Sequence, residues 1–144
     1  MSVTLELARK LADLCLEQAG RMQLKPLTVA ILDATGQLKL LLRQDGTSLL
    51  RADIAQGKAR GAVGLGMGSR AIYNRALEQP CFVQALNGLA GGSLVPVPGG
   101  VLIRDGAEII GAIGITGDTS DNDEACAVHA ITAAGLVADP GWDR

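Results

Sequence analysis

Aromatic residues are almost absent from this chain of 144 residues: they make up 2% of it and are limited to Tyr73, Phe82 and Trp142. Proteins that hold single-stranded nucleic acid usually stack the bases on aromatic rings, so this scarcity argues against such a function. The formal net charge of -2 also argues against a surface that follows phosphates. We therefore expect no nucleic-acid partner.

Cysteine is scarce as well, and Cys15, Cys81 and Cys126 lie far apart and outside any Cys-x-x-Cys pattern. Their odd number and wide spacing argue against a disulfide framework and a structural zinc site, so we expect reduced thiols and no metal centre. The first residues lack the basic and apolar regions of a signal peptide, and no apolar run reaches transmembrane length. These absences predict a cytoplasmic protein with no membrane contact.

What the sequence does contain is small aliphatic residues, with 48% hydrophobic content and 19 glycines. Apolar runs flank turn residues at two places, Asp33-Ala-Thr-Gly36 and Asp105-Gly106, and each place predicts a β-hairpin. Ser2 or Thr4 is positioned to cap a first helix. Its apolar stripe ends near Gly20 and consists of Leu5, Ala8, Leu11, Ala12, Cys15 and Ala19.

Further along the chain, helical patterns cover 48–68, 69–77 and 80–89 and then follow the acidic residues at 121–124. The order predicted is one helix, two strands, a helical middle, three strands and a last helix. This order favours an α+β fold, in which about five antiparallel strands form one sheet flanked by helices in layers. We predict a single domain over 1–138 and a detachable tail over 139–144.

Two predicted elements carry unusually little side-chain bulk. Gly57, Gly61, Gly64 and Gly68 recur on one face of a helix, where each glycine costs roughly 1 kcal/mol relative to alanine. In the second hairpin, alternation puts Ile109, Gly111, Ile113 and Ile115 on a core face and Ile110, Ala112, Gly114 and Thr116 on a nearly bare one. We expect these two surfaces to enclose a void that Lys58 and the Gly99-Gly100 pair border.

An ordered set of motifs resembles the GlcG/HbpS-like haem-binding family and the C-terminal domain of PduO-type proteins. The motifs are Asp33-x-x-Gly36, Arg43-x-Asp45-Gly46, Lys58-Ala59, Gly99-Gly100, Gly111-Ala-Ile-Gly-Ile-Thr-Gly117 and Asp121-Asn-Asp-Glu124. The resemblance covers nearly the whole chain. It implies a profilin-like layered fold, a homo-oligomer, haem or corrinoid (cobalamin) binding in some members, and an association with glycolate, glycerol or propanediol utilisation.

The basic residues Arg43 and Lys58 are candidates for binding carboxylates. The family resemblance implies that they hold haem propionates, or a small organic acid, near Gly99, Gly100 and Thr116. Gly114, which has no side chain, is a further predicted residue of this site. The helix start beside Gly117 offers free amides to an anionic group. The ordinary alternative for Arg43 and Lys58 is a solvated side chain on each element.

His129 is the only imidazole, and it shares a helical stripe with Asn122, Ala125 and Thr132, so we expect it to be accessible. It is a candidate axial ligand of haem iron, although single histidines are usually ordinary surface residues. Cys126, three residues earlier, adds a second donor, but two ligands are too few for a closed metal site. Asp121 and Glu124 have the spacing of an N-cap and its partner, which we favour over a catalytic pair.

Three functional hypotheses remain open from the sequence. The leading one is an oligomeric binding protein for a planar cofactor or small carboxylate. The second is an enzyme acting on a small carboxylate or aldehyde, in which Arg43 or Lys58 binds the substrate and Asp123 or Glu124 moves a proton. The sequence offers no Ser/His/Asp set to support catalysis. The third is a structural oligomer without a ligand, in which the glycine faces serve packing.

Overall fold

The computed structural model describes residues 1–142, which form five helices and five strands. In chain order the elements are α1 (Leu5–Met22), β1 (Thr28–Asp33), β2 (Leu38–Arg43), α2 (Arg51–Leu65), α3 (Ser69–Glu78), α4 (Pro80–Leu89), β3 (Gly100–Asp105), β4 (Glu108–Thr116), α5 (Ser120–Ala133) and β5 (Val137–Asp139). Both predicted hairpins are present, as β1–β2 and β3–β4.

The five strands form one sheet in the order β2-β1-β4-β3-β5, and all neighbouring strands are antiparallel. The predicted α+β class and strand number are thus confirmed. The position of one strand differs from the prediction, because the fifth strand follows the last helix instead of preceding it. The Val95–Pro98 step forms no strand, in keeping with the inability of its prolines to donate ladder hydrogen bonds.

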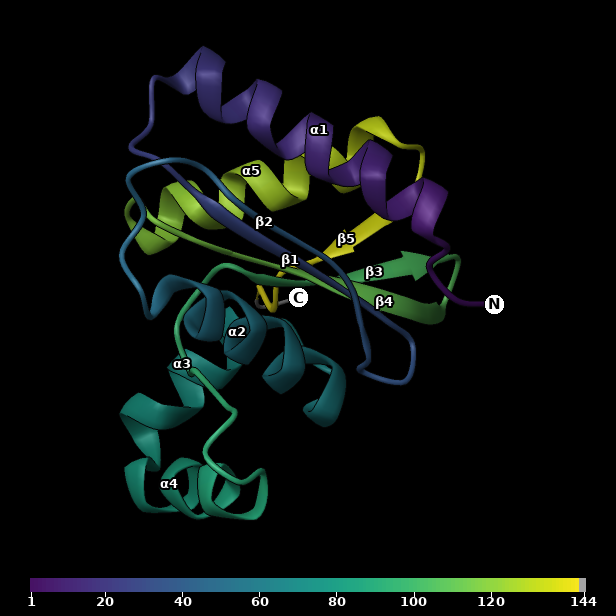
Figure 1. Cartoon of the computed structure of the whole chain (residues 1–144). Helices are drawn as coiled ribbons and strands as arrows, with labels where there is room; N and C mark the ends of the chain where they lie inside the picture. The colour runs from purple at the N-terminus through teal and green to yellow at the C-terminus, as the bar shows by residue number, and fades with distance from the viewer. Residues whose placement is uncertain (143–144) are drawn as a thin grey trace.

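Helices cover both faces of the sheet, as Figure 1 shows. Helices α1 and α5 lie side by side on one face and bury a core of branched side chains that includes Val29, Ile31, Ile113 and Ile115. Helix α2 lies on the other face, where the core consists of Leu32, Ala59, Ala62, Leu102 and Ala112. Small side chains on this second face bring α2 close to the strands.

Helix α1 follows its predicted pattern. The Thr4 side chain accepts a hydrogen bond from the Leu7 amide and caps the helix, and Gln23 ends it in the left-handed conformation with φ of 56°. Five of the six predicted stripe residues are buried, and Leu5 is exposed.

The predicted alternation of β4 is wrong at its first residues. Pairing with β3 shifts between Ile103 and Arg104, where Arg104 pairs with Ile109 and Ile103 pairs with Gly111. Ile110 is therefore the extra residue of a β-bulge, and it packs with Ile113 in the α1–α5 core while Ile109 packs toward α2. A bulge reverses which face each side chain occupies, and nothing in the alternation of the sequence indicates it.

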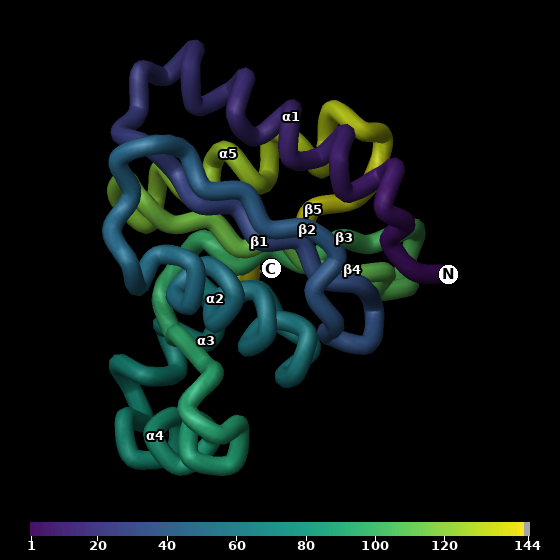
Figure 2. Tube along the Cα trace, in the orientation of Figure 1, coloured from purple at the N-terminus to yellow at the C-terminus, as the bar shows by residue number. Residues whose placement is uncertain are grey.

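Residues 139–142 do not behave as the detachable tail that the sequence suggests. Asp139 ends β5, which pairs with β3, and its carboxylate accepts a hydrogen bond from Arg104 at 2.9 Å. Pro140 and Gly141 are buried against the start of α3, where Arg70 N donates to Pro140 O at 3.2 Å. In Figure 2 the described chain ends beneath the sheet, on the side of α2. The rest of the predicted tail, 143–144, lies outside the described residues.

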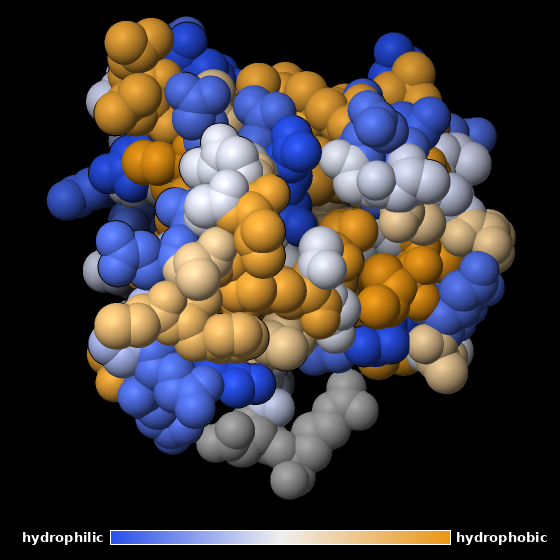
Figure 3. Space-filling view, turned by 90° about the horizontal axis from the view of Figure 1, so that it is seen from below, coloured by the Kyte–Doolittle hydropathy of each residue, from blue (hydrophilic) through white to orange (hydrophobic). Residues whose placement is uncertain are grey.

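Helices α3 and α4 form a small unit below α2, held by a third cluster of Ile72, Val83 and Leu94. Figure 3 views the molecule from this end and shows apolar side chains gathered at its surface. Among the exposed apolar residues, Leu77, Phe82 and Leu89 belong to α3 and α4. No described helix has both the length and the apolar character needed to span a bilayer.

Candidate functional site

The structure brings several predicted site residues together between α2 and the strands β3 and β4. We call this group the Lys58 cluster; its members are Lys58, Gly99, Gly100, Gly114 and Asp123. Lys58 comes from α2, and Asp123 comes from the first turn of α5. Gly100 of β3 pairs with Gly114 of β4, and Gly99 directly precedes β3. Four of the six sequence motifs thus contribute a residue to one place in the fold, and those of Asp33–Gly36 and Arg43–Gly46 lie elsewhere.

The void expected at this place does not exist, because α2 fills it. A β-carbon at Gly114 would overlap the carbonyl oxygen of Ala55, and one at Gly100 would overlap the carbonyl oxygen of Lys58. The missing side chains allow backbone to pack on backbone instead of leaving room for a ligand.

The glycine face of α2 also differs from the prediction, since at Gly57 and Gly61 it faces α3 and the segment before β3 instead of the bare face of β4. A β-carbon at Gly57 would meet Val95, and one at Gly61 would meet Leu94 and Ile72. Alanines on the neighbouring face make the close contact with β4.

The Lys58 ammonium is enclosed and hydrogen-bonded within the protein. Its Nζ donates to Ile115 O at 2.9 Å and lies 3.4 Å from Asp123 Oδ2, and the two side chains are only 2% and 1% exposed. Burial lowers the pKa of Lys58 and raises the pKa of Asp123, and the attraction between the two groups only partly opposes this effect. The geometry of this pair is that of a structural ion pair that joins α2 to α5.

The other predicted carboxylate ligands are also committed to contacts within the chain. Arg43 Nε, at the exposed end of β2, donates to Thr47 Oγ1 at 3.2 Å. Thr116 Oγ1 accepts a hydrogen bond from Arg51 Nη1 at 2.7 Å. Gly117, with φ of 138°, packs against the backbone of Pro26 and Leu27. The structure does not gather these residues around an open hollow.

The acidic start of α5 caps the helix differently from the prediction. The N-cap is Thr119, whose hydroxyl accepts from Asn122 N, so the predicted cap at Asp121 is wrong by two residues. Asp121 and Glu124 both bind Arg70 of α3. The second oxygen of Glu124 accepts the indole N–H of Trp142 at 2.8 Å. Glu124, one of the two acids proposed for proton transfer, thus holds α3, α5 and the C-terminal segment together.

His129 lies on the opposite side of the sheet from α2 and faces a hollow of about 470 Å³ on the surface of α5. We call this hollow the α5 groove; it is lined by Glu124, Ala125, Val128, His129, Thr132, Ala133 and Trp142. Its walls are mainly apolar. The partial burial of His129 agrees with the predicted accessibility.

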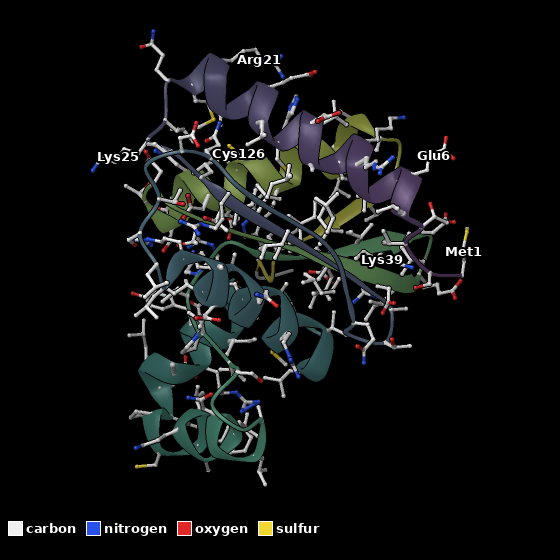
Figure 4. The ribbon with its side chains drawn as sticks, in the orientation of Figure 1. Met1, Glu6, Arg21, Lys25, Lys39 and Cys126 are labelled. Carbon is white, nitrogen blue, oxygen red and sulfur yellow. The ribbon has the colours of Figure 1, made fainter. Side chains whose placement is uncertain are left out.

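A basic residue of α1 contacts His129. Arg21 Nη2 lies 3.0 Å from His129 Nε2, and Gln18 accepts a second hydrogen bond from Arg21 Nε at 3.0 Å. Since a guanidinium can only donate, Nε2 is the acceptor, and the proton of the neutral ring is on Nδ1. Figure 4 shows Arg21 at the C-terminal end of α1.

Arg21 was not predicted from the sequence as a residue of this region, and neither was Trp142. Arg21 reads as an ordinary basic residue in the last turn of a helix, and its partner is 108 positions away. Trp142 falls in the segment predicted to be a tail. In the described chain, no group of three or more His, Cys, Asp or Glu side chains is arranged to hold a metal ion.

The family model for the haem-degrading protein HbpS-like family matches residues 3–132 of this sequence. No curated protein matches it. Among solved structures, PduOC in complex with haem superposes with a TM-score of 0.84 at 25% identity, covering 94% of this chain and 97% of the other. HbpS gives a TM-score of 0.81 at 25% identity, with 92% and 90% covered. The ORFY protein of Klebsiella pneumoniae shares the fold, with a TM-score of 0.81, 24% identity and 91% of each chain covered.

Proposed function

Because this chain belongs to the family of haem-degrading HbpS-like proteins, we propose that it binds haem, and that the α5 groove is the site. The observation that carries the proposal is the position of His129. The one imidazole of the chain borders a hollow with a mainly apolar lining, and an arginine touches its ring.

The chemistry of the groove fits the parts of a haem. Ala125, Val128, Ala133 and Trp142 offer an apolar wall to the macrocycle. The Nε2 atom of His129 is a neutral acceptor, which is the form that ligates iron. Bound haem would supply the redox chemistry of its iron. The protein would supply His129 Nε2 as an iron ligand and would exclude water from one face of the haem macrocycle.

Binding of haem would change the hydrogen-bond partner of Arg21. At present its guanidinium occupies the Nε2 lone pair that an axial ligand must use. When that lone pair turns to a metal, Arg21 loses its acceptor and becomes available to a propionate, with which it forms a stronger, charge-assisted hydrogen bond. The propionate-binding role that the sequence assigns to Arg43 and Lys58 therefore passes to Arg21.

The test is a haemin titration followed by the Soret band and by quenching of Trp142, which is the only tryptophan in the chain. We expect one haemin per chain, and no quenching by a cobalamin. His129→Ala should shift the Soret band and weaken binding at least tenfold. Gln84→Ala, on α4 at the far side of the sheet, is the matched control and should leave both unchanged. Identical spectra for the His129→Ala and unaltered chains would place the ligand elsewhere.

The shape of the groove also supports self-association. The hollow is open to solvent and is lined by one face of α5 and by Trp142, so we expect it to cover one face of a planar ligand. The apolar residues Leu77, Phe82 and Leu89 of α3 and α4 are exposed as well. We propose that a second copy of the chain covers such surfaces. Light scattering should give a mass above 14.8 kDa, and Phe82→Glu with Leu89→Glu should lower it. A monomer at high protein concentration would contradict this proposal.

A further inference from the structure

An open hollow between α2 and α4 takes no part in the proposed haem site. Helix α4 packs on α3 through Val83 and Ile72, and a space of about 300 Å³ remains between α4 and α2. We call this space the α2–α4 hollow. It lies on the side of the sheet that α2 covers, opposite the α5 groove, and Figure 1 shows α4 below α2. Its apolar lining includes Gly61, Gly64, Leu65, Leu86, Leu89 and Leu94.

Arg60 of α2 is the one cation on the described lining of this hollow, and it also borders two neighbouring hollows on the outer face of α2. Its side chain is exposed, and within residues 1–142 no hydrogen bond or ion pair holds it. Asp53 lines one of the neighbouring hollows, two helical turns before Arg60, but no acid is among the described residues that line the α2–α4 hollow. The guanidinium of Arg60 can therefore turn to an anion here without losing a contact.

Gly64 is not explained by packing within the described chain. At Gly61, by contrast, the missing side chain makes room for Leu94. A β-carbon at Gly64 meets nothing within 4 Å, although glycine is less favourable than alanine inside a helix. The missing side chain of Gly64 leaves the wall of the α2–α4 hollow open.

We propose that the α2–α4 hollow binds an aliphatic monocarboxylate, with its chain in the hollow and its head group on Arg60. Small-molecule sites are usually clefts of about 300–1,000 Å³ with a mainly apolar lining and a few polar groups that fix the orientation of the ligand. The α2–α4 hollow has this character and is at the small end of the range. The fork of a guanidinium matches the two oxygens of a carboxylate.

The hydrogen bonds around the hollow decide the class of anion. The backbone amides of residues 90–95 all donate within the chain, and the Ser93 hydroxyl donates to Ala90 O at 2.7 Å. Among the described residues of the lining, only Arg60 is left to donate to a ligand. A phosphate group has three strong acceptor oxygens, so a single guanidinium leaves it short of donors, whereas a carboxylate needs only one fork.

The chain and the head group of the ligand contribute differently to binding. An exposed ion pair contributes little affinity, because water and salt screen it. The affinity therefore comes from the apolar chain, and each methylene that enters the hollow should raise it by up to about fourfold. Arg60 selects the acid over a neutral alcohol of the same length.

The experiment is calorimetric titration of the full-length chain with butanoate, hexanoate and octanoate, with octanol as the neutral probe. We expect one site per chain, affinity that rises with chain length, and octanoate binding about fivefold tighter than octanol. Arg60→Gln should lower the affinity for octanoate to that for octanol. Arg9→Gln, on the exposed side of α1, is the matched control and should preserve the difference.

Gly64→Leu separates a ligand site from an accident of packing. Leucine favours a helix and has open space at this position, so the variant should fold with at least unaltered stability. Its side chain fills the α2–α4 hollow and should abolish octanoate binding. His129→Ala should leave octanoate binding unchanged, so this site and the haem site can fail independently.

Three results would overturn the proposal. The first is no octanoate binding by the unaltered chain, whether the hollow stays empty or a second copy of the chain fills it. The second is equal affinity for octanoate and octanol, which would mean that Arg60 selects nothing. The third is unchanged octanoate binding in a folded Gly64→Leu variant, which would place the ligand outside the α2–α4 hollow.

Discussion

Gly114 of β4 lies directly against the carbonyl oxygen of Ala55 in α2, with no space for a β-carbon between them. Gly100 makes the same kind of contact with the carbonyl of Lys58. Through these two glycines the middle of the sheet packs directly on the backbone of a helix. The sequence predicts low bulk here correctly, but the close packing removes the hollow that low bulk suggests.

Gly114→Ala should destabilise the fold, because the added methyl group forces α2 away from β4. Overpacking of this kind typically costs about 1–3 kcal/mol of unfolding free energy, and more where the obstacle is backbone. Urea denaturation followed by circular dichroism measures it. The matched control is Gly64→Ala in α2, where a β-carbon meets nothing within 4 Å. This substitution should raise the unfolding free energy by up to about 1 kcal/mol. Equal effects of the two substitutions would contradict the packing described here.

Lys58→Met should be among the most damaging substitutions outside the apolar core. It leaves the Asp123 carboxylate buried without its cation, and breaking a buried pair in this way costs about 3–5 kcal/mol. Lys10→Met, on the exposed side of α1, is the control and should change stability by less than about 0.5 kcal/mol.

The defect of Lys58→Met should shrink in acid. Burial raises the pKa of Asp123 above its ordinary 3.8, and losing Lys58 removes the attraction that opposes this rise. Between 3.8 and the raised value the folded state binds more protons than the unfolded state, so stability increases as the pH falls through that window. Unfolding midpoints measured from pH 7 down to pH 4 should converge with those of the unaltered chain. A constant difference over this range would mean that Asp123 is not the source of the defect.

Asp118 should have the opposite effect in acid. Hydrogen bonds from the Asn122 side chain and from the amides of Lys25 and Thr119 lower its pKa from 3.8 to about 2. The unfolded chain therefore takes up this proton at a higher pH than the folded chain, and stability is lost as the pH falls from 3.8 toward 2. Asp118→Asn should flatten this part of the stability curve, and Asn122→Ala should flatten it partly. Parallel acid curves for all three proteins would refute the assignment.

Asp139→Ala should loosen the C-terminal edge of the sheet. The substitution removes the acceptor of Arg104 Nε and of Gly141 N, two bonds that hold β5 and the following turn. We expect a loss of about 1–3 kcal/mol in unfolding free energy and faster amide exchange in β3. Glu17→Ala on the exposed face of α1 is the control, with an expected change of less than about 0.5 kcal/mol. Unchanged exchange in β3 would contradict the role given to this carboxylate.

Local signals in the sequence were sufficient for much of the fold. The turn at Asp105-Gly106, the cap at Thr4 and the apolar stripe of α1 each depend on residues a few positions apart, and all are present in the structure. The family resemblance added motifs, and the structure gathers the Lys58, Gly99-Gly100, Gly114 and Asp123 parts of them at one place. These parts of the fold were predictable because their causes are local or belong to the whole family.

The remaining features depend on partners far apart in the chain. The acceptor that excludes a side chain at Gly114 is a backbone carbonyl, which has no signature in the sequence. The contact of Arg21 with His129 and that of Trp142 with Glu124 join segments whose proximity follows only from the complete topology. For this reason His129 could be proposed as a ligand from the sequence, while its guanidinium partner and its groove could not.

Strand β2 is one edge of the sheet, and this position has a consequence for the behaviour of concentrated solutions. Within residues 1–142 no strand pairs with its outer side. Its sequence carries three consecutive leucines, Leu40–Leu42, between Lys39 and Arg43. Charges at such positions act as gatekeepers against edge-to-edge aggregation. The two cations therefore serve solubility at this edge, and replacing both with neutral residues would favour the growth of fibrous assemblies through β2.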